Sequence, residues 1–144
     1  MYQLFNSLHS YLRWILLLLL VIVVVKALLG WLGKKPFEKL DNTLSVSLLG
    51  ATHLQALLGL ILYFFLSPIT QSAFGDFGAA MKDKYLRFYA VEHLTIMLLA
   101  VVMIQLGRTL SKKAIGDQSK HKKLLIYTAI GLVLVLAGIP WDKI

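Results

Sequence analysis

The sequence predicts an all-α integral membrane protein folded as an up-down-up-down four-helix bundle. Of its 144 residues, 58% are hydrophobic and 15% are charged, whereas soluble domains average about 45–50% apolar and about 25% charged residues. Four apolar runs are each long enough to cross a bilayer, which takes about 20 residues. The loops between them are short, so we expect residues 1–144 to form a single transmembrane domain without a sizeable soluble domain.

The four predicted spans cover about residues 9–32, 44–66, 86–107 and 122–140. The first is expected to be retained, because it is too long for a signal-peptide core and no small-residue cleavage site precedes Lys34. The second carries polar residues in its first half, which need partners inside the bundle, and it ends at Pro68. The third ends at Arg108 and the fourth at Pro140. In the 67–84 segment, a short interfacial helix and an ordinary turn fit the sequence equally well.

Basic residues are distributed unevenly over the two sides of this bundle. Ten lie in or beside the first and third loops: Lys26, Lys34, Lys35, Lys39, Arg108, Lys112, Lys113, Lys120, Lys122 and Lys123. Five lie on the other side: Arg13, Lys82, Lys84, Arg87 and Lys143. Because cytoplasmic loops carry the excess of Lys and Arg, we expect both termini on the outer, periplasmic side. The net charge of +8 then reports orientation and does not indicate a nucleic-acid partner.

The chain has no cysteine and four histidines, one on each predicted helix. The absence of cysteine excludes disulfides, thiolate-held metal clusters and covalent attachment of c-type haem. In an up-down-up-down bundle the first and third helices are diagonal to each other, as are the second and fourth. His9 can then face His93, and His53 can face His121.

The outer pair, His9 and His93, is predicted to lie at one depth. His9 is 17 residues from Lys26, and His93 is 15 residues from Arg108. If both basic residues mark the cytoplasmic surface, the two histidines differ in depth by about 3 Å at a rise of about 1.5 Å per residue. The estimate depends on Lys26 reaching the interface with its long side chain. If Lys34 marks the surface instead, His9 moves outside the bilayer and this pair fails.

The inner pair, His53 and His121, matches less well. His53 is 15 residues from Pro68 and His121 is 19 residues from Pro140, a mismatch of about 6 Å at the same rise. Two neutral imidazoles facing each other at one depth suit axial ligation of b-type haem iron. The sequence therefore predicts an outer haem between His9 and His93, and leaves open an inner haem between His53 and His121.

Several short motifs are spread over nearly the whole chain: His9-Ser10-Tyr11-Leu12-Arg13-Trp14, His53-Leu54-Gln55, Leu58-Gly59-Leu60-Ile61-Leu62-Tyr63-Phe64, Glu92-His93, Gly107-Arg108 and Ile139-Pro140-Trp141. Together they resemble small four-helix bacterial membrane proteins described as cytochrome b-like, which implies haem b and the bacterial inner (cytoplasmic) membrane. They also resemble one half of haem A synthase, whose four-helix units hold haem between histidines on their first and third helices. The Glu-x-x-His-Arg arrangement of that family is not matched by Glu92 and His93, so hydroxylation of haem O is not implied.

Three other charged residues are candidates for a role beside the outer site. Arg13 lies one helical turn after His9 on the same face, where a cation can meet a haem propionate. Arg87, six residues before His93, is better explained as an anchor for phosphate headgroups. Glu92 either relays protons to an outer quinone pocket or forms a structural ion pair with Arg13 or Arg87.

The function expected from these features is that of a membrane b-type cytochrome carrying one or two haems. No residue is assigned a catalytic role, and the chain is expected to act as an electron-transfer protein or redox subunit rather than as a stand-alone enzyme. Expected partners are the lipid bilayer, quinone, and a partner redox subunit or a second copy of the chain. The alternatives are a cofactor-free scaffold or accessory subunit, and a small proton-coupled transporter with Glu92 and His93 as its proton site.

Overall fold

The computed structural model describes residues 1–143, with side chains through Asp142. Ile144 and the side chain of Lys143 lie outside the described part. Lys143 is one of the five basic residues predicted on the outer side. Every regular element there is helical: α1 (Tyr2–Leu32), α2 (Lys39–Ile61), η1 (Leu62–Leu66), α3 (Pro68–Gly75), α4 (Phe77–Ala80), α5 (Lys84–Arg87), η2 (Phe88–Glu92), α6 (His93–Lys113), α7 (Asp117–Gly138) and η3 (Trp141–Lys143). The prediction of an all-α chain is therefore confirmed.

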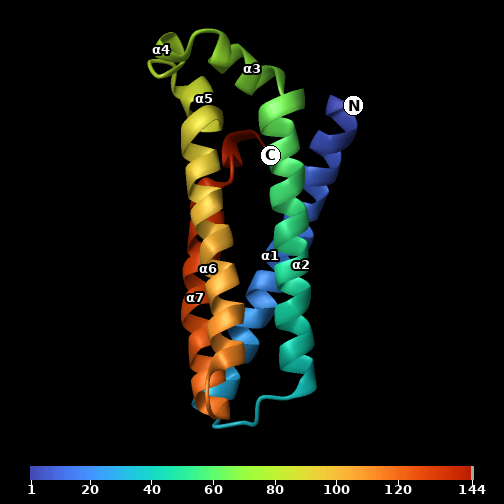
Figure 1. Cartoon of the computed structure of the whole chain (residues 1–144), viewed down its shortest axis with the longest axis vertical. Coiled ribbons are helices and arrows are strands. Elements are labelled where there is room, and N and C mark those ends of the chain that lie inside the picture. Colours follow the sequence, from blue (N-terminus) through green and yellow to red (C-terminus); the bar gives the residue numbers. More distant parts are fainter. Residues whose placement is uncertain (144) are drawn as a thin grey trace.

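Four of the described helical segments are long and apolar enough to cross a membrane: residues 2–32, 39–66, 84–113 and 117–138. Figure 1 shows them running alternately down and up, with the N-terminus, the α3–α5 connection and the C-terminal segment in the upper part of the view. We call this the terminal end of the bundle. The α1–α2 and α6–α7 connections lie at the opposite end, which we call the basic end.

The long helices begin earlier than their apolar runs predict. Helix α1 starts at Tyr2, so His9 lies about two turns inside it. Helix α2 starts at Lys39 because Glu38 and Asp41 form a capping box, in which the Glu38 backbone N–H donates to Asp41 Oδ2 at 2.8 Å. Helix α7 starts at Asp117, directly after Gly116, whose φ of 88° suits glycine.

The four long helices form a ring in which each packs against two neighbours. Helix α1 contacts α2 and α7, and α6 contacts the same two helices, so α1 and α6 are diagonal, as predicted. Glycines bring α6 and α7 close together: a Cβ added to Gly131 would lie 2.8 Å from Ile104 Cγ1. The main buried cluster runs through the ring and contains Leu16, Leu20, Val23, Leu48, Ala100, Ile104, Leu124 and Val135.

Two π-helical segments, η1 and η2, are joined to each other and to α3 at the terminal end. The hydroxyl of Tyr63 in η1 donates to the carbonyl of Ala90 in η2 at 2.5 Å. The wider helical turn leaves the Tyr63 carbonyl free to accept from Thr70 Oγ1 of α3 at 2.7 Å. For residues 67–84 the sequence left open a short helix or an ordinary turn. The structure has two short helices there, α3 and α4, with Ser67 and Pro68 at the start of α3. Such π segments are frequent at functional sites.

Candidate functional site

A cavity of about 380 Å³ lies in the half of the bundle near the terminal end. Its volume is within the range of about 300–1,000 Å³ that is typical of small-molecule and cofactor sites. Both histidines of the predicted outer pair line it, with Arg13, Gln55, Gly59 and Tyr89 among the other lining residues. His9 is 23 residues from the end of α1, and His93 is 20 residues from the end of α6. Since both helices end at the basic end, their depths differ by about 4–5 Å at the usual rise.

His93 is held in one orientation by the end of the neighbouring helix. Its Nδ1–H donates to the carbonyl of Gly138 at 2.7 Å. Gly138 is the last residue of α7, where a carbonyl has no partner inside its own helix. Because a carbonyl can only accept, this hydrogen bond places the proton on Nδ1 and leaves the lone pair on Nε2. A histidine oriented in this way has the arrangement that metal-ligating histidines use.

His9 lies against the backbone of α2. A Cβ added to Gly59 would come within 3.1 Å of His9 Cε1, so glycine is what allows this approach. The His9 carbonyl accepts from Gln55 Nε2 at 2.8 Å. His9 Nδ1 and Gln55 Oε1 are buried and have no hydrogen-bond partner in the described part of the chain. Buried polar atoms are normally paired, so these two atoms mark a place where a ligand or a water molecule would complete the site.

Arg13 adds a cation to the same cavity. Its guanidinium stacks over the ring of Trp14, 5.1 Å from the ring centroid. Its Nε is buried without a hydrogen-bond partner, and no carboxylate of the described residues forms an ion pair with it. A partly buried cation of this kind favours an anionic group on a ligand.

The structure does not bring the predicted inner pair together. His53 is exposed on α2 and its Nε2 lies 3.0 Å from Gln105 Oε1. His121 is 1% exposed, and its Nε2–H donates to the Lys35 carbonyl at 3.2 Å. Counted from the starts of α2 and α7 at the basic end, their depths differ by about 15 Å at about 1.5 Å per residue. Neither lines the cavity near the terminal end, and the two do not fit a haem held between them.

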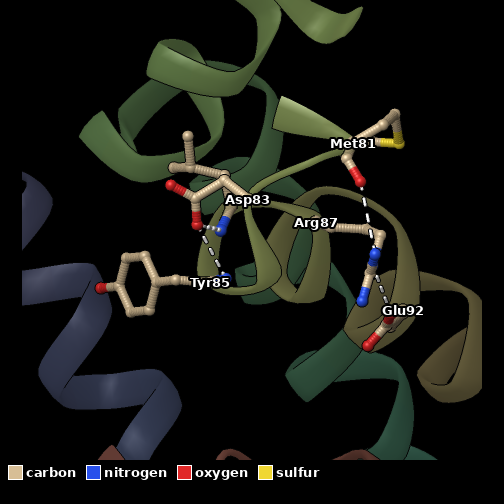
Figure 2. A network of polar contacts seen from close by, with 6 residues as sticks. Met81, Asp83, Tyr85, Arg87 and Glu92 are labelled. Atoms are coloured by element: carbon tan, nitrogen blue, oxygen red, sulfur yellow. Dashed lines mark hydrogen bonds and ion pairs between the residues drawn. The ribbon is translucent and has the colours of Figure 1, made fainter. Parts of the chain in front are cut away.

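Glu92 has a structural partner outside the cavity. Arg87 Nε donates to Glu92 Oε1 at 2.9 Å, and Arg87 Nη1 donates to the Met81 carbonyl at 3.3 Å (Figure 2). In the same network the carboxylate of Asp83 caps α5 by accepting from the backbone N–H of Tyr85 at 2.9 Å. The Glu92 side chain is 43% exposed and does not line the cavity. Of the two roles expected for Glu92, a proton relay and a structural ion pair, the structure contains the ion pair with Arg87.

Lys26 forms an ion pair that sequence reasoning missed. Its Nζ lies 2.8 Å from Asp41 Oδ1, and the Asp41 side chain is only 4% exposed. The sequence predicts only that Lys26 extends its long side chain to the interface. The spacing of Glu38 and Asp41 does carry the signal of a capping box, but nothing in it points to Lys26. The hydrogen bond from His93 to the Gly138 carbonyl was missed as well, although the place of Gly138 two residues before Pro140 indicates a helix end with a free carbonyl.

The fold and the site thus define an all-helical chain with four helices long and apolar enough to span a membrane, and with a cavity near the terminal end to which two diagonal helices each contribute a histidine. No group of three or more His, Cys, Asp or Glu side chains that could hold a metal ion occurs among residues 1–143. Comparison of the chain with protein families, curated proteins and solved structures found no match.

Proposed function

We propose that the chain is a membrane-inserted b-type cytochrome that binds one haem between His9 and His93 and transfers electrons. The observation that carries the proposal is the shared cavity, in which His93 is held with its Nε2 lone pair unoccupied. A haem iron takes four ligands from its porphyrin and needs only two from the protein. Two histidines from diagonal helices therefore suffice.

The residues of the cavity fit such a group in three ways. His93 is oriented by Gly138, and His9 is seated on Gly59 with a buried ring nitrogen that lacks a partner. Arg13 supplies a cation without a counter-ion, suited to a propionate. When bound, haem supplies a one-electron couple between ferric and ferrous iron. Apolar residues of the cavity, such as Leu16, Met97 and Val135, would lower the local dielectric around such a group, which tunes the potential of the couple.

The proposed setting is the inner membrane of a bacterium, with both termini on the outer side. The support is the excess of basic residues at the basic end, ten against five. The ion pair between Lys26 and Asp41 reduces the cost of placing a lysine within the long apolar helix α1. In this orientation His9 and His93 lie toward the outer face, where they would hold the haem within reach of quinone, a partner redox subunit or a second copy of the chain.

The test is an absorption spectrum of the protein purified in detergent after expression with haem supplied. We expect Soret and alpha bands that shift on reduction with dithionite, and one haem per chain by pyridine haemochrome. His93→Ala and His9→Ala are expected to lose the bands, whereas His53→Ala, at an exposed position outside the cavity, keeps them. Colourless but folded protein would overturn the proposal. Two haems per chain would contradict the single site and support a second haem held by His53 and His121.

A further inference from the structure

A more open surface hollow, of about 470 Å³, lies near the basic end along α6 and beside Leu49 of α2. It is lined by Leu49, Gln105, Arg108, Thr109, Lys112 and Lys113, none of which lines the histidine cavity. We call it the basic groove. A Cβ added to Gly50, the residue after Leu49, would meet nothing within 4 Å, so this stretch of α2 borders open space.

The three cations of the basic groove, Arg108, Lys112 and Lys113, have no ion-pair partner among the described residues. Other lysines nearby are engaged differently. Lys26 pairs with Asp41, and Lys120 Nζ donates to the carbonyls of Ser111 and Lys112 at the end of α6. The positive charge of the groove is thus left available for an anion from outside the chain.

One stripe of α6 changes from apolar to polar to basic as it enters the groove. Residues three and four apart share a helix face, and the stripe consists of Leu98, Val102, Gln105, Thr109 and Lys112. Leu98 and Val102 are 43% and 49% exposed, while Gln105 Nε2 donates to Thr109 Oγ1 at 3.0 Å. On α2, Val46, Gly50, His53 and Leu57 form a stripe three and four residues apart. The contact between His53 and Gln105 joins the two stripes at the upper limit of the groove.

We propose that the basic groove binds one anionic phospholipid. Its phosphate lies among Arg108, Lys112 and Lys113, and one acyl chain follows the exposed apolar residues of α6. The order of groups along the stripe matches that of a phospholipid, and basic pockets between helices on the cytoplasmic side bind anionic headgroups. Arg108 adds a planar donor that suits phosphate. The inference rests on the proposed membrane insertion and orientation, and it is independent of the haem.

The experiment is native mass spectrometry of the detergent-purified full chain titrated with phosphatidylglycerol or with phosphatidylcholine of the same acyl chains. The groove variant is Arg108→Gln/Lys112→Gln/Lys113→Gln. The control variant, Lys34→Gln/Lys39→Gln/Lys123→Gln, removes three exposed charges from the same end outside the groove. We expect one phosphatidylglycerol bound at least tenfold more tightly than phosphatidylcholine, with this preference lost in the groove variant and kept in the control.

Three results would overturn the proposal: no preference for phosphatidylglycerol, equal loss in both triple variants, or displacement of the lipid by equimolar glycerol phosphate, which would make a soluble phosphate the ligand. If the groove variant does not fold, the exposed Lys112→Gln variant alone is expected to weaken phosphatidylglycerol binding severalfold, and unchanged binding contradicts the proposal. The absorption spectrum of each variant separates this test from the test of the haem proposal. A protein that prefers phosphatidylglycerol but shows no haem bands would refute the haem proposal and leave the lipid proposal standing.

Discussion

Replacing Gly30 by alanine tests whether His121 is a packing residue. The ring of His121 lies flat on Gly30: a Cβ added there would be 2.4 Å from Cε1, 2.5 Å from Nδ1 and 2.7 Å from Nε2. These distances are shorter than any van der Waals contact. His121 is 1% exposed, so the whole ring has to move into space that other atoms already fill.

The expected cost follows from three terms. Overpacking a buried site costs about 1–3 kcal/mol, and losing the hydrogen bond from His121 to the Lys35 carbonyl costs about 0.5–1.5 kcal/mol. Alanine in place of glycine inside a helix returns about 1 kcal/mol. The net loss is about 2 kcal/mol at the centre of these ranges, which for a chain of this size lowers the Tm by roughly 6–8 °C.

The assay is thermal unfolding in detergent, followed by tryptophan fluorescence. Gly50→Ala is the matched control, because its added Cβ meets nothing within 4 Å, and it is expected to raise the Tm slightly. In the double variant Gly30→Ala/His121→Ala the clash is gone, so the two changes should couple by about 1.5 kcal/mol or more. Equal Tm values for Gly30→Ala and Gly50→Ala, or additive effects in the double variant, would refute the packing role.

Two further substitutions test contacts at opposite ends of the bundle. Asp41→Ala removes the partner of Lys26 and the capping acceptor of α2. We expect thermal unfolding to show a loss of about 1–3 kcal/mol in stability, which adding Lys26→Met partly recovers. An unchanged Tm in Asp41→Ala would contradict this expectation. Tyr63→Phe removes the hydroxyl that donates to the Ala90 carbonyl. We expect a loss of about 0.5–1.5 kcal/mol in stability and faster hydrogen exchange in η2. The control Tyr11→Phe, at a position 72% exposed, is expected to change neither, and the expectation fails if the two variants behave alike.

The sequence predicts well those features that depend on composition and on position along a helix. The four apolar runs predict four long helices, and the short connections predict that the first and third are diagonal. Counting residues predicts that His9 and His93 lie at similar depth, and both line one cavity. The helix starts are predicted less well, because polar segments such as the one from Glu38 to Asp41 continue a helix past the apolar run through their own capping bonds.

The pairing of His53 with His121 fails for a physical reason. Residue spacing fixes how far along its helix a side chain lies, but the direction in which it points depends on how the helix is rotated against its neighbours. That rotation is set by packing. On α2 it directs Thr52 and Leu48 into the core and leaves His53 exposed beside Gln105. On α7 it directs His121 toward α1.

Two histidines rest on a glycine of a neighbouring helix, yet only one is suited to hold a ligand. At Gly30 the added Cβ would lie 2.5 Å from His121 Nδ1, which like His9 Nδ1 is buried without a hydrogen-bond partner among the described residues, and His121 Nε2 already donates to the Lys35 carbonyl. At Gly59 the nearest His9 atom is Cε1 at 3.1 Å, and both ring nitrogens lie farther away, at 3.8 Å. His9 also lines an open cavity. A glycine beneath the ring and a buried, unpaired Nδ1 therefore do not distinguish packing from ligation, whereas a cavity shared with a second histidine and a cation does.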